Sequence, residues 1–216
     1  MKGTEDMAEK NNVKKPASFI EEARRKQIVE SALRTIAEKG YSKTSFAEIA
    51  KELGITKGLI AYHFEGKQDL FLSIIDAIID GQARNIAARL EGRTGAKERL
   101  QSYTEASFEY IVANRPKAVA LVDLWGSFTS AEEKRAFNAR AYGPCSNILR
   151  GIFEQGQQNG EFRDFNPHTL TQVLQGAIDG VMLQFVFNPG GIDMDDCARD
   201  TLELILGWVT NKETLK

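Results

Sequence analysis

The sequence predicts an all-α protein. Apolar residues recur at intervals of three and four along most of the 216-residue chain, which is the spacing of one face of a helix. No segment of useful length alternates apolar and polar residues as a half-buried strand does, and no internal repeat is present. With 42% hydrophobic residues, the chain can bury a sizeable core. Caps and turns divide the pattern into about nine helices.

The first predicted helix covers residues 19–39 and carries one apolar stripe. Gly40, directly after it, is a common C-terminal stop. Ser45 is the expected N-cap of the second helix, and Glu48, three residues later, would complete a capping box. Apolar residues then recur at i, i+3, i+4 and i+7 as far as Leu53, so this helix has one buried face.

The third helix is expected to be only two turns long. Gly54 forms the turn before it, Thr56 caps its N-terminus, and it ends near His63. A helix this short is stable only when it packs on its neighbours. Two short helices joined by a glycine-containing turn are the outline of a helix-turn-helix, whose second helix enters the major groove of DNA.

A long amphipathic helix is expected from Lys67 to about Leu90, before the polar run EGRTG. At 1.5 Å per residue, such a helix spans roughly 36 Å. It is therefore long enough to connect a small head to a larger body.

The rest of the chain predicts five more helices. Ser130 with Glu133 repeats the capping-box pattern, and Gly143-Pro144 is expected to kink or break the helix that contains it. The expected spans are about 96–114, 116–127, 131–159, 166–187 and 193–210.

Charge is unevenly distributed along the chain. Between Lys14 and Lys57, ten Lys and Arg residues stand against six Asp and Glu residues, a net charge of +4. The whole chain carries −2, which leaves −6 for the remainder. A basic head on an acidic body suits a local phosphate-binding face, although chance scatter produces the same numbers.

Composition excludes several other classes of protein. Cys145 and Cys197 are far apart, and neither they nor the two histidines have metal-ligand or redox spacing, so we expect no metal and no cofactor. The charged N-terminus has no apolar core of a signal peptide, and residues 1–17 are expected to be a disordered tail. No apolar run is long enough to span a bilayer. We therefore expect a cytoplasmic protein with no membrane partner.

The candidate DNA contacts lie at helix starts and on the outer face of the third helix. A helix N-terminus offers unpaired N–H groups and partial positive charge, which suits phosphate. Hydroxyls from Thr44, Ser45 and Thr56 lie at two such starts, and Lys57 and Lys67 add positive charge. The outward residues of the third helix are Thr56, Lys57, Gly58, Leu59, Tyr62 and His63. Among them, a lysine can pair with guanine and a leucine can touch a thymine methyl. The alternative is a three-helix packing unit whose third helix is merely solvated.

From Arg24 to Leu70 the chain resembles the N-terminal domain of the TetR family of bacterial transcriptional regulators. The matching residues, in order and spacing, are Ile36, Gly40, Thr44-Ser45, Ile49-Ala50, the run Leu53 to Gly58, His63-Phe64, Lys67 and Leu70. The C-terminal part is similar to the family only in length and helix count. The resemblance implies a helix-turn-helix DNA-binding domain over residues 18–66 and an effector-binding and dimerisation domain over residues 67–216.

The resemblance also implies roles for single residues. Ser45 and Lys67 would hold phosphates, and the outward residues of the third helix would face the groove. The family often has Tyr, which usually contacts the DNA backbone, where this chain has Ala61. A subset of the family that resembles choline-responsive repressors also has a small residue there. The phosphate contact would then come from Tyr62 or from His63.

For the body, the resemblance implies a two-fold dimer and a ligand cavity. The dimer would form a four-helix bundle from the last two helices of each subunit. Its candidate residues are Leu170, Leu174, Ile178, Phe185, Leu202, Ile205, Trp208 and Val209. The candidate cavity residues are the aromatics Tyr103, Phe108, Trp125, Phe128 and Tyr142 and the polar anchors Asp123, Asp179 and Gln184. The alternative is that these apolar residues are ordinary core of a single chain.

The sequence therefore predicts a ligand-responsive transcriptional regulator. We expect a homodimeric repressor that binds double-stranded palindromic operator DNA and is released by a small, largely apolar effector. One alternative is an all-helical small-molecule-binding protein or enzyme with a vestigial head, but no nucleophile, base and acid set supports it. Another is an architectural DNA binder without an effector, which the aromatic-rich acidic body disfavours.

Overall fold

The structure is a computed structural model that describes residues 19–210, so the predicted disordered tail lies outside the described residues. Within this range the chain forms nine α-helices and one short 3₁₀ helix, with no strand, which confirms the all-α prediction. The elements are α1 Phe19–Lys39, η1 Tyr41–Lys43, α2 Phe46–Leu53, α3 Lys57–His63, α4 Lys67–Leu90, α5 Ala96–Ala113, α6 Arg115–Trp125, α7 Ala131–Gln158, α8 Pro167–Phe187 and α9 Met194–Thr210.

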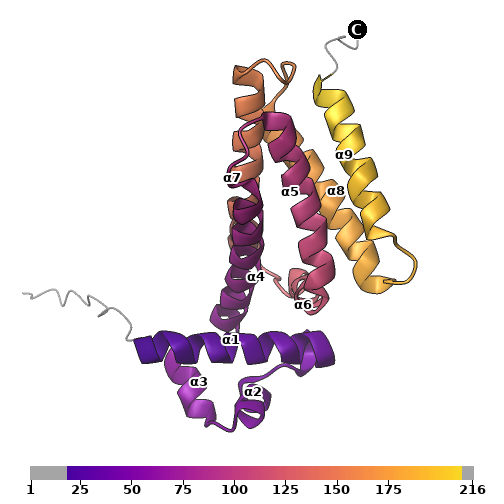
Figure 1. The fold of residues 1–216 in the computed structure, drawn as a ribbon. Helices are drawn as coiled ribbons and strands as arrows, with labels where there is room; N and C mark the ends of the chain where they lie inside the picture. The colour runs from indigo at the N-terminus through magenta and orange to yellow at the C-terminus, as the bar shows by residue number, and fades with distance from the viewer. Residues whose placement is uncertain (1–18, 211–216) are drawn as a thin grey trace, which may run out of the picture.

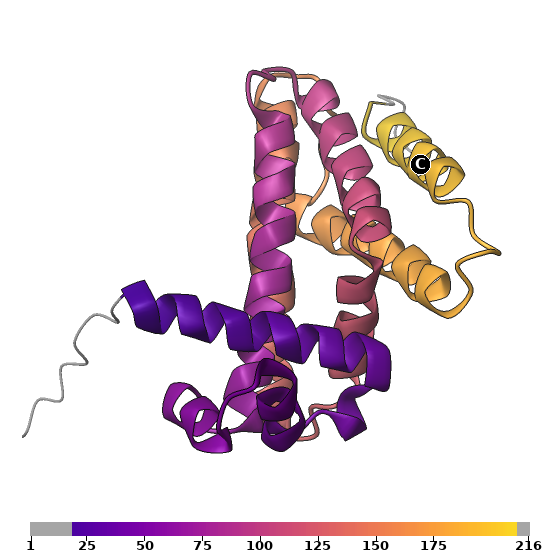
Figure 2. The ribbon, with the colours of Figure 1, turned by 60° about the horizontal axis from the view of Figure 1, so that its bottom comes forward.

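Helices α1 to α3 form a head at one end of the molecule, and the remaining helices form an elongated body (Figure 1). Helix α1 lies across the end of the body, with α2 and α3 on its far side. Helix α4 leaves the head and runs along the body beside α7 and α5, as the turned view also shows (Figure 2). Helix α4 therefore belongs to both parts, as its length predicted.

Burial of apolar side chains explains why the short helices of the head are stable. Ile49 of α2 and Ile60 of α3 are completely buried against Ile28 and Ile36 of α1 in one continuous core. Burying an aliphatic side chain of this size stabilises the fold by roughly 1.5–3 kcal/mol. Neither two-turn helix would persist without these contacts.

The two predicted capping boxes have different outcomes. Around Ser130 the box is complete, because the Ser130 side chain and the Glu133 side chain each bond the other residue's backbone N–H. At Ser45 only half of it forms: the hydroxyl accepts from the backbone N–H of Glu48 at 3.2 Å. The Glu48 carboxylate instead pairs with Lys39 at the end of α1. The full box predicted there is wrong, because a cation from the preceding helix lies within reach of the carboxylate.

Helix α7 is continuous through Gly143-Pro144, so of the two predicted outcomes, a kink or a break, the break does not occur. A proline inside a helix removes one backbone hydrogen bond and crowds the carbonyl four residues earlier. On either side of Pro144, however, Ala141, Cys145 and Leu149 are buried in the core. Packing of this face against α4 and α5 keeps the two halves in one helix.

Helix α8 is the one described helix whose length and composition match those of a membrane span. This is weak evidence, because core helices of soluble proteins have the same composition. Its buried side packs against α5, α6, α7 and α9. Val173, Leu183 and Phe187 are exposed apolar residues on the same helix.

Candidate DNA-binding head and effector cavity

The outer face of α3 is accessible. Thr56, Lys57, Gly58 and Tyr62 are exposed, whereas Ile60 on the opposite face is buried. Leu59 and His63, also predicted to face DNA, are partly exposed. The predicted reading face is therefore presented to solvent as one continuous helical surface.

The two cap hydroxyls lie at the start of α2 and of α3. Thr56 Oγ1 accepts from the backbone N–H of Leu59 at 3.2 Å, as Ser45 Oγ does from Glu48. Because each cap uses the oxygen as an acceptor, the hydroxyl hydrogen is still able to donate to a phosphate. Both residues are exposed, as a phosphate contact requires.

Thr44 does not belong to this set. Its side chain is completely buried, and Thr44 Oγ1 donates to the carbonyl of Gly40 at 3.0 Å. This corrects the assignment of Thr44 to the DNA-facing residues. The side chain points into the chain because it closes the tight corner between α1 and α2, which spacing along the sequence does not reveal.

Lys67 is half-buried and already has partners. Its Nζ donates to the carbonyl of Tyr41 at 3.3 Å and lies 4.3 Å from the centre of the Tyr41 ring. Burial lowers the pKa of Lys67. In this structure Lys67 therefore fixes the corner that follows α1, and its phosphate contact stays a prediction.

Tyr62 is 70% exposed and is held by α1. Its hydroxyl donates to the Glu21 carboxylate at 2.9 Å, and this bond raises the pKa of the Tyr62 phenol. The ring also packs edge-on against His63, with 5.1 Å between ring centres. The chain thus presents a positioned phenol one residue after Ala61.

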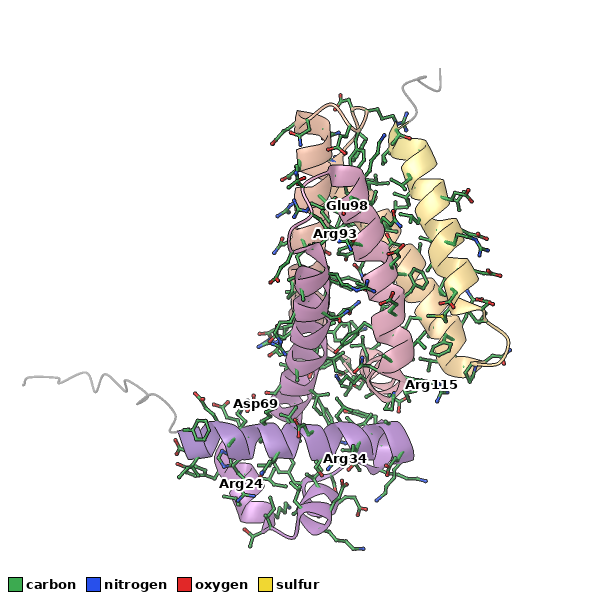
Figure 3. The ribbon with its side chains drawn as sticks, in the orientation of Figure 1. Arg24, Arg34, Asp69, Arg93, Glu98 and Arg115 are labelled. Carbon is green, nitrogen blue, oxygen red and sulfur yellow. The ribbon has the colours of Figure 1, made fainter. Side chains whose placement is uncertain are left out.

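Arg25 of α1 contacts both the end of α3 and the start of α4. Its guanidinium lies 4.1 Å from the centre of the Phe64 ring and donates to the carbonyl of His63. It also donates to Asp69 at 3.3 Å and to Ser73 at 2.7 Å. Figure 3 places Asp69 at the start of α4, close to α1. Arg25 therefore sets the angle between α3 and the long helix that enters the body.

A cavity of about 440 Å³ lies between α7 and α8. Most of its lining residues are polar, including Asn138, Tyr142, Gln172, Gln175 and Asp179. Two basic residues, His168 and Arg150, also line it, and Arg150 pairs with Glu154 on its own helix. The Asp179 carboxylate accepts hydrogen bonds from Tyr142 and Gln175, while burial raises its pKa to about 6. None of the ion pairs found among residues 19–210 includes Asp179. The floor of this cavity thus carries a carboxyl group without a cationic partner.

A second, much smaller void of about 20 Å³ lies behind this floor. Its walls are mostly apolar and include Trp125, whose ring centre is 6.4 Å from that of Tyr142. Tyr142, Gln175 and Asp179 line both spaces and so separate them. The hydroxyl of Tyr103 supports this partition by donating to Gln175 at 3.1 Å.

Of the predicted cavity aromatics, Tyr142 lines the main cavity and Trp125 lines the inner void. Tyr103 is buried behind the floor. Phe108 and Phe128 are buried and line neither of these two spaces, so they are ordinary core here.

Two of the predicted polar anchors are wrong. Asp123 is exposed and accepts the backbone N–H of Tyr41 in the head at 3.2 Å. Gln184 is exposed and donates to Gly180 on its own helix. Both lie on helix faces directed away from the cavity, which depends on how α6 and α8 pack. Sequence reasoning missed Gln175, although a polar residue one turn before Asp179 in an apolar helix was a usable indication.

The predicted dimer residues divide into two groups. Leu170, Leu174, Ile178, Phe185 and Val209 are more than nine-tenths buried within the single chain, so they are core and not interface. Leu202 and Ile205 are partly buried. Trp208 is 38% exposed and stacks with Arg163, whose guanidinium lies 3.7 Å from a ring centre. Periodicity identified the apolar helices but could not tell inner from outer apolar faces.

The exposed apolar residues of the last two helices are Val173, Leu183, Phe187, Leu204 and Trp208. A groove of about 460 Å³ between α8 and α9 includes three of them in an almost wholly apolar lining. We call these five residues the α8/α9 face.

A wider open groove of about 1020 Å³ separates the end of α3 from the first turns of α7. Several of its charged residues already bond within the chain: Arg25 with Asp69, Arg140 with Asp76, and Glu133 with the α7 cap. We therefore assign no ligand to it. Among the described residues, no three His, Cys, Asp or Glu side chains are grouped as metal ligands.

Comparison with known proteins agrees with this geometry. Residues 28–74 match the model for bacterial regulatory proteins of the tetR family. Residues 96–207, about half of the chain, match the model for the C-terminal part of BetI-type transcriptional repressors. A fatty acid metabolism regulator protein of Bacillus subtilis is 26% identical over 187 residues, which cover 86% of this chain and 95% of that protein.

Two solved structures are similar over most of their length. One is a putative transcriptional regulator from Saccharomonospora viridis in complex with choline, with a TM-score of 0.76, 26% identity and coverage of 88% of this chain and 100% of that one. The other is FadR from Bacillus subtilis in complex with stearoyl-CoA, with a TM-score of 0.77, 25% identity and coverage of 85% and 98%. These similarities confirm a ligand-responsive transcriptional regulator and exclude the enzyme alternative. The chain belongs to the TetR family of bacterial regulatory proteins.

Proposed function

We propose that this regulator is a cytoplasmic dimeric repressor whose effector carries a cationic group. The dimer binds a palindromic operator through the two heads, and the effector enters the cavity between α7 and α8 and releases the DNA. The observation that carries the effector class is the partly buried Asp179 carboxyl in the cavity lining, which has no cationic partner among the described residues.

In the DNA complex, Ser45 and Thr56 donate to phosphates and the outer face of α3 enters the major groove. Lys57, Leu59 and His63 reach base edges or phosphates from that face. Tyr62 supplies the backbone contact that Ala61 cannot make, because its side chain is exposed and its hydroxyl exchanges the Glu21 carboxylate for a phosphate oxygen. Lys67 contributes positive charge behind this surface. Since phosphates supply much of the affinity, binding weakens steeply with salt.

The α8/α9 face supports the dimer. Leu204 and Phe187 are 74% and 75% exposed, although each is a large apolar side chain. Val173, Leu204 and Trp208 line one apolar groove, and soluble monomers rarely leave a large contiguous apolar patch uncovered. Pairing this face with its copy across a two-fold axis covers it and holds two heads at a defined spacing.

The positive charge of the proposed effector is inferred from the electrostatics of Asp179 at the cavity floor. An ionised carboxylate in a low-dielectric site is costly unless a positive charge pairs with it. The Tyr142 ring lines the same cavity as Asp179 and adds a cation–π attraction of about 0.5–2 kcal/mol. The relative bound to choline holds a cation of this kind. The inner void of about 20 Å³ has no room for an acyl chain such as that of stearoyl-CoA, so the effector is confined to the main cavity of about 440 Å³.

Calorimetric titration tests the effector class. Choline chloride is compared with 3,3-dimethylbutanol, its neutral isostere, and with stearoyl-CoA. We expect choline to bind wild type, the neutral isostere to bind at least tenfold more weakly, and D179N to lose that preference. D164N, which alters an exposed carboxylate between α7 and α8, is the matched control. Binding of stearoyl-CoA without binding of choline would reject the cationic effector.

The operator is tested separately by footprinting promoter fragments around the regulator's own gene at low salt. We expect a protected palindrome that choline removes. Failure to protect any duplex would reject the proposed DNA recognition, whatever the calorimetry shows.

A further inference from the structure

Helix α6 is attached at both ends to different parts of the molecule. At its start, Arg115 donates to the carbonyl of Val186 on α8 at 3.2 Å. Figure 3 shows Arg115 at the end of the body that faces the head. Near its other end, Asp123 accepts the backbone N–H of Tyr41 at 3.2 Å. Helix α6 therefore bridges a helix that lines the cavity and the corner that precedes α2.

On the head side, Tyr41 is the centre of a tight corner. Its carbonyl accepts from the backbone N–H of Thr44 at 3.1 Å and from Lys67, and its ring centre lies 4.9 Å from that of Phe71. Gly40 has φ of +82°, and a Cβ added there would lie 3.6 Å from Asp123 Oδ2. The N-cap Ser45 follows directly. Any displacement of Tyr41 is therefore passed to the start of α2.

On the cavity side, α6 carries Trp125 two residues after Asp123. The Trp125 ring centre lies 6.1 Å from that of Phe137 and 6.4 Å from that of Tyr142. Tyr142 in turn holds Asp179 at the cavity floor. A ligand bound at Asp179 also contacts Tyr142, because both residues line the cavity, and the packed aromatic cluster connects Tyr142 to the end of α6.

We propose that Asp123 couples the cavity to the DNA-binding head. It fixes the corner at Tyr41 to α6, so that a shift of α6 repositions α2 and, with it, α3. This proposal rests on the effector cavity proposed above. The other route between the two sites is α4, which starts in the head and packs along α7 and α5.

The contact can be tested without an effector, by native hydrogen–deuterium exchange of the full chain. The readout is the exchange rate of amides in residues 40–53, which cover the corner and α2. A hydrogen bond of ordinary net strength changes a local opening equilibrium by roughly 2–10-fold. We therefore expect D123A to speed exchange in residues 40–45 about fivefold. D123N keeps an acceptor oxygen and should stay within about twofold of wild type, as should the control D164A.

A double-mutant cycle then tests the coupling itself. Y142A perturbs the cavity wall on α7 and should change the exchange of α2 amides in the wild-type background. In the D123A background the same substitution should have no further effect on α2, because the connection is already broken. Tyr142→Phe, which removes only the hydroxyl that holds Asp179, repeats the cycle if Y142A folds poorly.

Two outcomes overturn the proposal. One is an effect of the Tyr142 substitutions that is equal in both backgrounds or absent from both. The other is unchanged exchange in D123A. Equal effects would assign the coupling to α4.

Experiments with choline distinguish a failure of the coupling role of Asp123 from a failure of the proposed effector class. If choline fails to bind while the cycle shows coupling, only the effector class is wrong. If choline binds and still releases operator DNA from D123A as fully as from wild type, Asp123 has no coupling role.

Discussion

The phenol of Tyr62 on α3 donates a 2.9 Å hydrogen bond to the carboxylate of Glu21 on α1. This contact orients an exposed aromatic ring at the edge of the reading face before any DNA is present. It also holds a negative charge beside the surface that phosphates approach. Glu21 therefore has two opposite effects on DNA affinity. It positions the Tyr62 ring, which favours binding, and it repels the DNA phosphates, which weakens binding.

Glu21→Gln should strengthen operator binding. The amide keeps an acceptor for the Tyr62 hydroxyl but removes the repulsion between a carboxylate and the phosphates, so we expect a gain of roughly threefold to tenfold at low ionic strength that shrinks as salt is added. Y62F should weaken binding by about fivefold, because a phosphate donor is lost. The measurement is fluorescence anisotropy with labelled operator, and E22Q on the same turn is the control. If E21Q weakens binding as much as Y62F does, positioning outweighs repulsion.

Two glycines near α3 should respond oppositely to alanine. Gly54 has φ of +65°, a left-handed conformation that costs a residue with a Cβ about 1–2 kcal/mol. G54A should therefore lower the free energy of unfolding in urea. Gly58 is helical, and a Cβ there would meet only Thr56 Oγ1 at 3.8 Å. G58A should raise the free energy of unfolding by up to about 1 kcal/mol and still reduce operator affinity, because the added methyl lies on the reading face. Increased operator affinity in G58A would show that this surface is not in close contact with DNA.

The partly buried Asp179 carboxyl makes the free energy of unfolding depend on pH. Its pKa is raised from 3.8 to about 6 by burial, so the folded chain binds this proton more tightly than the unfolded chain does. The free energy of unfolding should therefore decrease as pH rises from about 4 to about 6, by on the order of 2 kcal/mol from this group. D179N should remove that component of the slope, which chemical denaturation at several pH values measures. A slope identical to that of wild type would mean that Asp179 titrates normally.

The affinity for a cationic effector should change with pH in the direction opposite to the free energy of unfolding. The carboxylate attracts a cation only when it is ionised, so choline affinity should rise with pH up to about 6 and level off above it. Calorimetric titrations between pH 5 and 8 test this. Affinity that falls over this range would place the cation elsewhere.

Substituting the exposed apolar residues of α8 and α9 should separate the dimer. Phe187→Glu and Leu204→Glu place a charge where the proposed interface would bury it, which costs several kcal/mol per subunit. We expect monomers in sedimentation equilibrium and loss of cooperative operator binding, with little change in helix content. Val112 on α5 is also exposed, at 47%, and V112E is the control because it lies outside the α8/α9 face. Dimers that persist in both variants would place the interface on another surface.

Local features of the head and body could be predicted closely from the sequence. The starts of α2, α3, α7 and α9 depend on Ser45, Thr56, Ser130 and Asp193, each of which caps backbone N–H groups no more than three residues away. The turn at Gly54 and the apolar faces of the helices likewise depend only on nearby residues. The family resemblance, carried by this same local pattern, indicated the regulator function.

Only the tertiary structure decided which of two equally apolar faces, or two equally polar residues, has a given role. Thr44 turns inward because a corner closes around it, and Asp123 meets Tyr41, which is 82 positions away along the chain. Leu174 is core and Leu204 is exposed, although both lie on apolar helices. The sequence by itself determined the helices and their caps, because these depend on contacts within about one turn. Packing angles between helices determined the partners of Asp123, Lys67 and Asp179, because those contacts form between segments that approach each other only in the folded chain.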